Sequence, residues 1–327
     1  MNINPHTKQH PVALLSVVIP LYNEEEIATE LVQRVVKSCR VLPLRFEVVI
    51  VNDGSKDHTL EKLIALTYTI PELRVINLLR NFGHMAALSA GLAASLGDAV
   101  VIMDGDLQDP PELIPNFVEE WKKGADVVYG LRVARREGYV KRTLICGFYW
   151  LLDKITETKI PKQVGTFGLM DRRIADILLA MPERSRYFAG LRAWVSDRQA
   201  FVSYERPDRE GGGSRVGAQG LFRLARTALI SFSKVPLRYA SMLSLFTGLL
   251  LFIVGTFAVV EKLFTNLAIP GWATSTALIG FMGFVQSLVL AMLAEYVAVI
   301  FDEVKARPIF LIREEFRAGQ VYNSRSL

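Results

Sequence analysis

The chain has 327 residues, of which 51% are hydrophobic, and a formal net charge of +5 at pH 7. Its mean hydropathy of +0.27 is high for a soluble protein. Because the apolar residues concentrate after Arg238, we expect a soluble body joined to a membrane segment. The positive charge suits an anionic lipid or substrate, and the lack of any nucleic-acid-binding motif excludes nucleic acid as a partner. Two distant cysteines, Cys39 and Cys146, provide neither a disulfide framework nor metal-ligand spacing.

Residues 1–15 contain no long apolar run behind a basic stretch, so we expect no signal peptide and a body that stays in the cytoplasm. Short β-branched runs then alternate with helical patterns. Strands are expected at 15–20, 46–52, 73–79, 99–103 and 126–129. Helices are expected at 24–39, 59–66, 84–96 and 110–123. This alternation predicts an α/β fold with a Rossmann-like, mostly parallel sheet, whereas the pattern from 131 to 197 is mixed.

Two apolar stretches near the C-terminus, 241–260 and 275–300, are each long enough to cross a bilayer as a helix. Only 261–274 separates them, which predicts a transmembrane hairpin of two helices. Basic residues flank its outer ends, at Lys234, Arg238, Lys305, Arg307, Arg313 and Arg317. The connecting segment carries only Lys262. The positive-inside rule therefore predicts a multi-pass protein of the cytoplasmic (inner) membrane with its body and both termini in the cytoplasm.

These patterns divide the chain into a cytoplasmic domain (1–200), an intermediate region (201–238), two membrane helices (239–305) and a cytoplasmic tail (306–327). Within the intermediate region, 220–232 is amphipathic, which fits an interfacial helix against membrane lipids or an ordinary surface helix.

Three residues of the predicted spans have their own interpretation. Glu295 lies in the second span near its cytoplasmic end, and we interpret it as snorkelling or bonding between subunits rather than as a functional carboxylate. Gly248 and Gly255 would allow close helix contact in a homo-oligomer.

The string Asp-Gly-Asp-Leu-Gln-Asp-Pro-Pro at 104–111 follows a predicted strand. The carboxylates of Asp104 and Asp106 suit a hard divalent cation, Mg²⁺ or Mn²⁺, and Gln108 offers a further oxygen. Such a cation neutralises charge on a leaving diphosphate. Asp-Gly-Asp alone also fits an ordinary turn, but the longer string favours a metal site. Asp106 or Asp109 would orient an acceptor.

Three further polar clusters, 20–24, 52–59 and 81–84, also follow predicted strands. Asp53 can accept hydrogen bonds from a base or ribose, and Tyr22 can stack on a base. Asp57 as the cap of the next helix explains the same string and is compatible with binding. A lone histidine such as His84 is more often structural, yet it shares this edge. Ligands of parallel sheets bind at the carboxyl ends of the strands, so one site is predicted there.

Together these strings resemble glycosyltransferase family 2. Within it they are similar to the polyprenyl-phosphate branch of dolichol-phosphate mannose synthase and the bacterial undecaprenyl-phosphate glucosyltransferases. The resemblance covers 16–310 and is carried by Asp-Gly-Ser-Lys-Asp-His-Thr at 53–59, Asn-Phe-Gly-His-Met-Ala-Ala at 81–87, the string at 104–111, and Glu-Val-Lys-Ala-Arg-Pro at 303–308.

What the resemblance implies is a GT-A-type fold and inverting transfer of a sugar, glucose from UDP-glucose, to a polyisoprenyl phosphate such as undecaprenyl phosphate. The phosphate oxygen would attack the anomeric carbon directly. Because that phosphate is already anionic, no strong general base is required.

The resemblance also implies roles for individual residues. It assigns the nucleotide pocket to Pro20, Tyr22, Glu24 and Asp53, and we expect Ser55, His84 and Asp104 to bind the nucleotide sugar as well. It assigns the metal to Asp104, Asp106 and Gln108. We expect the catalytic residues to be Asp104, Asp106 and Asp109. The resemblance assigns the acceptor phosphate to Arg132, Lys141 or Arg142, Arg206, Arg209, Ser214 and Arg215. Guanidinium groups bind phosphate oxygens in pairs, although a basic rim facing anionic lipid explains the same arginines.

Two strings depart from the branch. Residues 165–169 read Gly-Thr-Phe-Gly-Leu where the branch often has Gly-Asp-Phe-Arg-Leu, so Thr166 and Gly168 stand in the Asp and Arg places. Arg215 stands where lysine is usual. These departures leave UDP-galactose, GDP-mannose and an amino-arabinose donor open beside UDP-glucose.

Two other functions are alternatives. A processive polysaccharide synthase is disfavoured because its Gln-x-x-Arg-Trp motif is missing from the sequence. A non-catalytic membrane scaffold is disfavoured by the intact aspartate string.

Overall fold

The computed structural model describes residues 14–132, 164–183, 186, 188–205, 235–264 and 271–322. They form two units. An α/β unit contains the described chain up to residue 205 together with residues from 307 onward, and a helical unit lies between these two parts in the sequence. The predicted interfacial helix at 220–232 lies outside the described residues.

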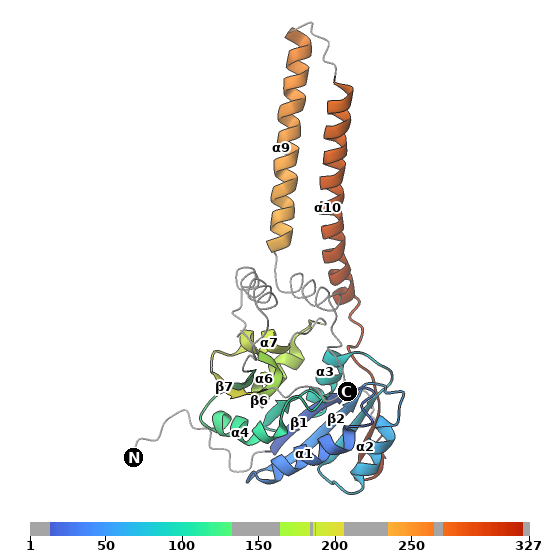
Figure 1. The fold of residues 1–327 in the computed structure, drawn as a ribbon, viewed down its shortest axis with the longest axis vertical. Coiled ribbons are helices and arrows are strands. Elements are labelled where there is room, and N and C mark those ends of the chain that lie inside the picture. The colour runs from blue at the N-terminus through green and yellow to red at the C-terminus, as the bar shows by residue number, and fades with distance from the viewer. Residues whose placement is uncertain are drawn as a thin grey trace, which may run out of the picture. The chain divides into compact units, whose positions relative to one another are not determined.

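The α/β unit is built on one mixed sheet (Figure 1). Its strands are β1 (Leu14–Leu21), β2 (Arg45–Asn52), β3 (Leu73–Leu78), β4 (Ala99–Ile102), β5 (Val127–Arg132), β6 (Val164–Asp171), β7 (Gln199–Tyr204), β8 (Ile312–Arg317) and β9 (Gln320–Tyr322). Across the described residues their order is β7-β5-β6-β4-β1-β2-β3-β8-β9. β6 and β8 run antiparallel to their neighbours, whereas the pairings among β1 to β4 and between β5 and β7 are parallel. The predicted α/β fold with a mostly parallel sheet is confirmed.

Buried β-branched residues explain the central strands. Val17, Val18 and Ile19 of β1 are all 0% exposed, as in parallel strands covered on both faces. Val17 and Ile19 belong to the core that also holds Leu31 of helix α1 (Ala28–Arg40) and Phe117 of helix α4 (Ile114–Lys122). Helix α3 (His84–Ala94) packs against β1 and β2 from the other face.

The helices of this unit are α1 (Ala28–Arg40), α2 (Thr59–Thr67), α3 (His84–Ala94), the 3-10 turn η1 (Pro111–Leu113), α4 (Ile114–Lys122), α6 (Arg172–Ala180) and α7 (Phe188–Val195).

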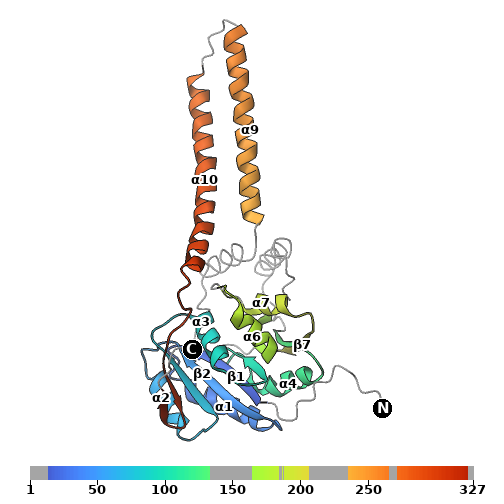
Figure 2. The same cartoon turned by 180° about the vertical axis from the view of Figure 1, so that it is seen from behind.

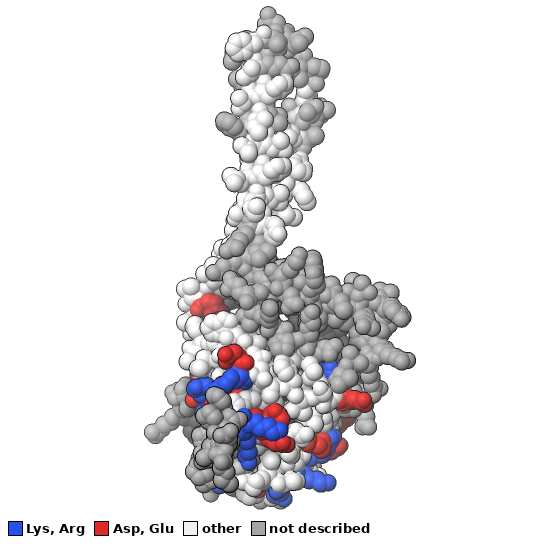
Figure 3. All heavy atoms as spheres, turned by 90° about the vertical axis from the view of Figure 1, so that its left-hand side faces the viewer, with Lys and Arg blue, Asp and Glu red and all other residues white. Residues whose placement is uncertain are grey.

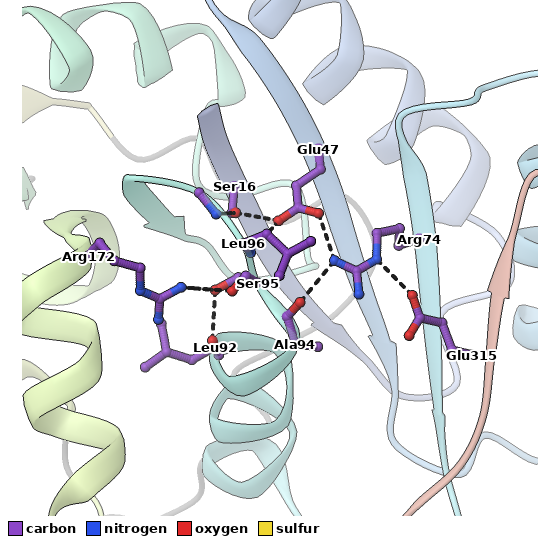
Figure 4. Close-up of polar contacts among 10 residues, drawn as sticks. Ser16, Glu47, Arg74, Leu92, Ala94, Ser95, Leu96, Arg172 and Glu315 are labelled. Atoms are coloured by element: carbon purple, nitrogen blue, oxygen red, sulfur yellow. Dashed lines mark hydrogen bonds and ion pairs between the residues drawn. The ribbon is translucent and has the colours of Figure 1, made fainter. Parts of the chain in front are cut away.

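A buried ionic network ties the C-terminal strand β8 to the sheet (Figure 4). Arg74 of β3 donates through Nε to Glu315 of β8 and through Nη1 to Glu47 of β2, both at 2.7 Å. The Arg74 and Glu47 side chains are 8% and 9% exposed. Glu47 also accepts hydrogen bonds from the Ser16 hydroxyl and the backbone N–H of Leu96, each at 2.6 Å. The network therefore fixes the loop that leads into β4.

The described part of the helical unit contains the helices α9 (Val235–Phe264) and α10 (Trp272–Val304), which lie side by side (Figures 1 and 2). Among the described residues, one segment, Leu278–Phe301 of α10, is long and apolar enough to cross a membrane, and few of its residues are buried by the rest of the chain. α9 holds a shorter apolar stretch, Tyr239–Leu250. In Figure 3 the described surface of these helices is largely free of charged side chains. The second predicted span therefore has the character of a membrane helix, and the first stays a prediction.

Candidate active site at the carboxyl edge of the sheet

The carboxyl ends of six strands meet at one edge of the sheet. β1, β2, β3, β4, β5 and β7 all run in the same direction because β6, between β4 and β5, is antiparallel to both. Every described polar cluster that the sequence analysis singles out follows one of these ends. The topology thus brings together residues that lie far apart in the sequence.

Asp104 and Asp106 follow β4 and are partly exposed at this edge. Nε2 of His84, the first residue of α3, lies 3.2 Å from Oδ1 of Asp104. Asp106 accepts a hydrogen bond from the backbone N–H of Gln108 at 3.2 Å, and Leu107 between them has a positive φ of 57°. This tight turn holds both carboxylates and the Gln108 amide at the strand end.

The oxygen atoms at this turn fit a divalent cation that takes some of its ligands from the protein and the others from a substrate. No cluster of three or more His, Cys, Asp or Glu side chains with metal-site geometry occurs in the described chain. Two aspartates and an amide oxygen nevertheless suit Mg²⁺ or Mn²⁺, because hard cations with few protein ligands take further oxygens from water and substrate phosphates.

Asp53 ends up below the surface rather than exposed at the edge, with 3% of the residue accessible. Its two carboxylate oxygens accept hydrogen bonds from the backbone N–H groups of Phe82, at 2.7 Å, and Gly83, at 2.9 Å. Burial raises the pKa of Asp53 above that of an ordinary aspartate, although these N–H groups oppose the shift. Asp53 therefore orders the loop that presents His84.

The loops after β1 and β2 are joined by hydrogen bonds. The backbone N–H of Asn23 donates to the Ser55 hydroxyl at 3.0 Å, and that of Glu24 donates to the Thr59 hydroxyl at 2.9 Å. Tyr22 is 37% exposed, so its ring is available to a base. Pro20 is buried inside β1 and supports the loop from beneath.

Gly54, in the turn after β2, should tolerate no side chain. Its φ is +66°, and a Cβ would lie 2.6 Å from both the carbonyl carbon of Arg80 and the backbone nitrogen of Asn81. We expect Gly54→Ala to displace the β3–α3 loop and to lower the free energy of unfolding by about 1–3 kcal/mol. Gly83→Ala is the matched control, since Gly83 has a φ of +95° but no atom within 4 Å of such a Cβ. Thermal unfolding of the two full-length variants measures this change. An equal decrease in the free energy of unfolding for both variants would contradict the steric argument.

Asp109, predicted to be catalytic, is 0% exposed and contacts protein side chains. It accepts a hydrogen bond from the Tyr204 hydroxyl at 2.6 Å, and Nη2 of Arg132 lies 3.5 Å from the same oxygen. The structure therefore places Asp109 behind the site. Arg132 lies at the edge itself. Burial by itself would lower the pKa of its guanidinium, but Asp109, Tyr204 and Asp104 together raise that pKa above its usual value.

A buried arginine lies where the 165–169 string departs from the branch. Arg192 of α7 is 0% exposed, donates to the Gly165 carbonyl at 2.9 Å and stacks over the Tyr129 ring at 4.9 Å. A Cβ on Gly168 would lie 3.1 Å from its Nη1 and 2.3 Å from the Val128 carbonyl. The Arg192 guanidinium thus lies next to Gly168, which stands in the Arg place of the branch, but it comes from α7 rather than from the 165–169 string.

The remaining predicted phosphate ligands, Lys141 or Arg142, Arg206, Arg209, Ser214 and Arg215, lie outside the described residues.

Comparison with known proteins identifies the family. Residues 16–178 match the sequence pattern of glycosyl transferase family 2. The chain is 39% identical over 301 residues to an uncharacterized glycosyltransferase of Synechocystis sp., covering 92% of this chain and 95% of the relative. It is 36% identical over 306 residues to a prophage-derived bactoprenol glucosyl transferase of Shigella flexneri, covering 93% and 99%. Among solved structures it is similar to glucosyl-3-phosphoglycerate synthase of Mycobacterium tuberculosis in complex with Mn²⁺, UDP-glucose and phosphoglyceric acid, with a TM-score of 0.45, 21% identity and coverage of 67% and 78%. The sequence relatives, together with the α/β fold, show that the chain is a glycosyltransferase of family 2.

Proposed function

We propose that this glycosyltransferase moves glucose from UDP-glucose to a polyisoprenyl phosphate such as undecaprenyl phosphate, with inversion, at the cytoplasmic face of the membrane. The observation that carries the proposal is the shared carboxyl edge of the sheet, where Asp104 and Asp106 follow β4 and Arg132 ends β5, with the charge of Asp104 acting on the Arg132 guanidinium. Acidic side chains suited to a cation-bound diphosphate and a cationic guanidinium suited to a phosphate would then belong to one site. The bactoprenol glucosyl transferase relative supports this choice of sugar and acceptor.

On the donor side, the loops after β1 and β2 would hold the nucleoside, with Tyr22 against the base and Asp53 ordering the wall of the pocket. Asp104, Asp106 and Gln108 would hold Mg²⁺ or Mn²⁺, which when bound supplies positive charge to the leaving nucleoside diphosphate. His84 contacts Asp104 and would fix the orientation of that carboxylate.

On the acceptor side, Arg132 would bind the lipid phosphate and direct one of its oxygens at the anomeric carbon. The phosphate is anionic at neutral pH, so the chain needs to position it rather than remove a proton from it. The arginines at 206, 209 and 215, with Arg142, would add further contacts to the same phosphate.

The sheet supports a membrane hairpin of two spans. β7 and β8 belong to the same sheet, yet α10 separates them in the sequence. If α10 crosses the bilayer once, the chain must cross it a second time between residues 205 and 312 for β8 to reach β3. α9 is the described helix available for that crossing, and its exposed residues include Leu245, Phe246, Leu249 and Phe257. The body and both ends of the hairpin would then lie on one side.

The test is transfer of labelled sugar by the purified full-length chain in detergent, with undecaprenyl phosphate and Mg²⁺ or Mn²⁺. We expect a single hexose in the organic phase with UDP-glucose, and no product after a chelator is added. UDP-galactose, GDP-mannose and an amino-arabinose donor are run in parallel, and product from one of these alone would change the donor. A growing polymer would indicate a processive synthase. No product from any donor with folded protein would overturn the proposal in favour of a scaffold.

A further inference from the structure

Arg132 is held by two buried side chains that sequence patterns do not connect with it. Its Nε donates to the Tyr204 hydroxyl at 3.1 Å, and that hydroxyl donates to Asp109 at 2.6 Å. Arg132 and Tyr204 are register partners at the ends of β5 and β7. Asp109 comes from the segment after β4 and is 0% exposed. Three elements of the sheet thus converge on one guanidinium.

The direction of each hydrogen bond in this cluster is determined by chemistry. A guanidinium only donates, so the Tyr204 oxygen must accept from Arg132. Burial and the negative charge of Asp109 raise the pKa of Tyr204 well above that of an ordinary tyrosine. The phenol therefore keeps its single hydrogen, which it donates to Asp109. The Tyr204 hydroxyl therefore accepts from Arg132 and donates to Asp109.

The guanidinium is also confined from beneath. A Cβ on Gly165 of β6 would lie 2.7 Å from Nη2 of Arg132, so the group packs directly on the Gly165 backbone. The Arg132 side chain is 28% exposed, which leaves part of it accessible at the edge of the sheet. A long, flexible side chain is in this way restricted to one orientation before any ligand binds.

We propose that Tyr204 and Asp109 are positioning residues that orient Arg132, so that its accessible N–H groups meet the acceptor phosphate with little loss of side-chain entropy. The proposal rests on the proposed function and adds two residues to it. Asp109 keeps Tyr204 in the donor role toward itself, and Tyr204 holds Nε of Arg132. Both act through the arginine and contact neither the phosphate nor the sugar.

The first test is Tyr204→Phe, which removes the hydroxyl and keeps the ring, whose centroid lies 5.6 Å from that of Phe167. We expect the KM for undecaprenyl phosphate to rise by about tenfold, as for loss of one hydrogen bond to a charged group. The KM for the nucleotide sugar and the thermal unfolding midpoint should change little. Tyr322→Phe is the matched control, because Tyr322 lies on β9 and its hydroxyl contacts only Gln320 among the described residues. A rise in the KM for the nucleotide sugar as large as that for the acceptor would overturn the positioning role.

The second test is a double-mutant cycle with Arg132→Ala. If Tyr204 acts through Arg132, Tyr204→Phe should have almost no further effect on the acceptor KM once the arginine is absent. The same tenfold rise in both backgrounds would overturn the proposal, because it would show a direct or purely structural effect. Absence of transfer by the wild-type chain would instead overturn the proposed function, so the two failures are distinguishable.

Discussion

Asp106→Ala is expected to lower the rate of sugar transfer by about 10³-fold, because the leaving diphosphate would lose the cation that balances its charge. Asp106 is partly exposed at the end of β4, and its neighbour Asp104 already has a contact with His84. The remaining aspartate and Gln108 would then hold the cation weakly. The loss should appear in kcat at saturating substrate.

Binding measurements separate this role from a structural one. Calorimetry of UDP with the full-length wild-type chain should show tighter binding with Mn²⁺ than with chelator, and Asp106→Ala should remove that difference. Asp176→Ala is the control, because Asp176 is 63% exposed on α6 and pairs with Arg172. Mn²⁺-dependent binding that survives in Asp106→Ala would contradict the assignment of the cation to this carboxylate.

Glu47→Ala should lower the free energy of unfolding by about 3–5 kcal/mol, since it removes one partner of a buried ion pair and leaves the other charged. Arg74 would keep Glu315 and the Ala94 carbonyl as partners, and the Ser16 hydroxyl and the Leu96 N–H would lose their acceptor. The loop into β4 would lose its anchor at the same time. Thermal or denaturant unfolding of the full-length chain measures this loss.

Two further variants calibrate the measurement. Glu315→Ala should have a smaller effect than Glu47→Ala, because its side chain is more exposed, at 23%, and Arg74 keeps Glu47. Glu61→Ala on the surface of α2, where the side chain is 76% exposed beside His58, should change stability by less than about 1 kcal/mol. If Glu47→Ala behaved like Glu61→Ala, the network would have no structural importance.

The parallel strands were predictable because their residues are buried on both faces. Val48, Val49, Ile50 and Val51 of β2 are all 0% exposed, and such a continuous apolar run has a clear sequence signal. The clusters after these strands were predictable for the same reason, since each follows a strand end. Because the strands before them are parallel, Asp104, Asp106 and His84 lie at the same edge of the sheet.

The sequence alone could not reveal contacts made between distant segments. β8 reads Ile-Arg-Glu-Glu-Phe-Arg, and its charged residues hide a strand whose Glu315 pairs with a buried arginine 241 residues earlier. Tyr204 likewise meets Asp109 across 95 residues. Asp109 was predicted to be catalytic from its string, but no local pattern reports that it points inward to Tyr204. Side-chain direction after a turn depends on tertiary packing.

The position of β8 also sets the order in which the protein can be completed. A ribosome releases residues 278–301 before it releases Glu315, so the apolar segment must be accommodated while β3 still has an open edge. An open edge strand is prone to pair with other chains. During this interval Arg74 has only one of its two carboxylate partners. Pairing of β8 with β3 therefore comes after residues 278–301 have been made, and on the proposed topology it follows insertion of the membrane hairpin.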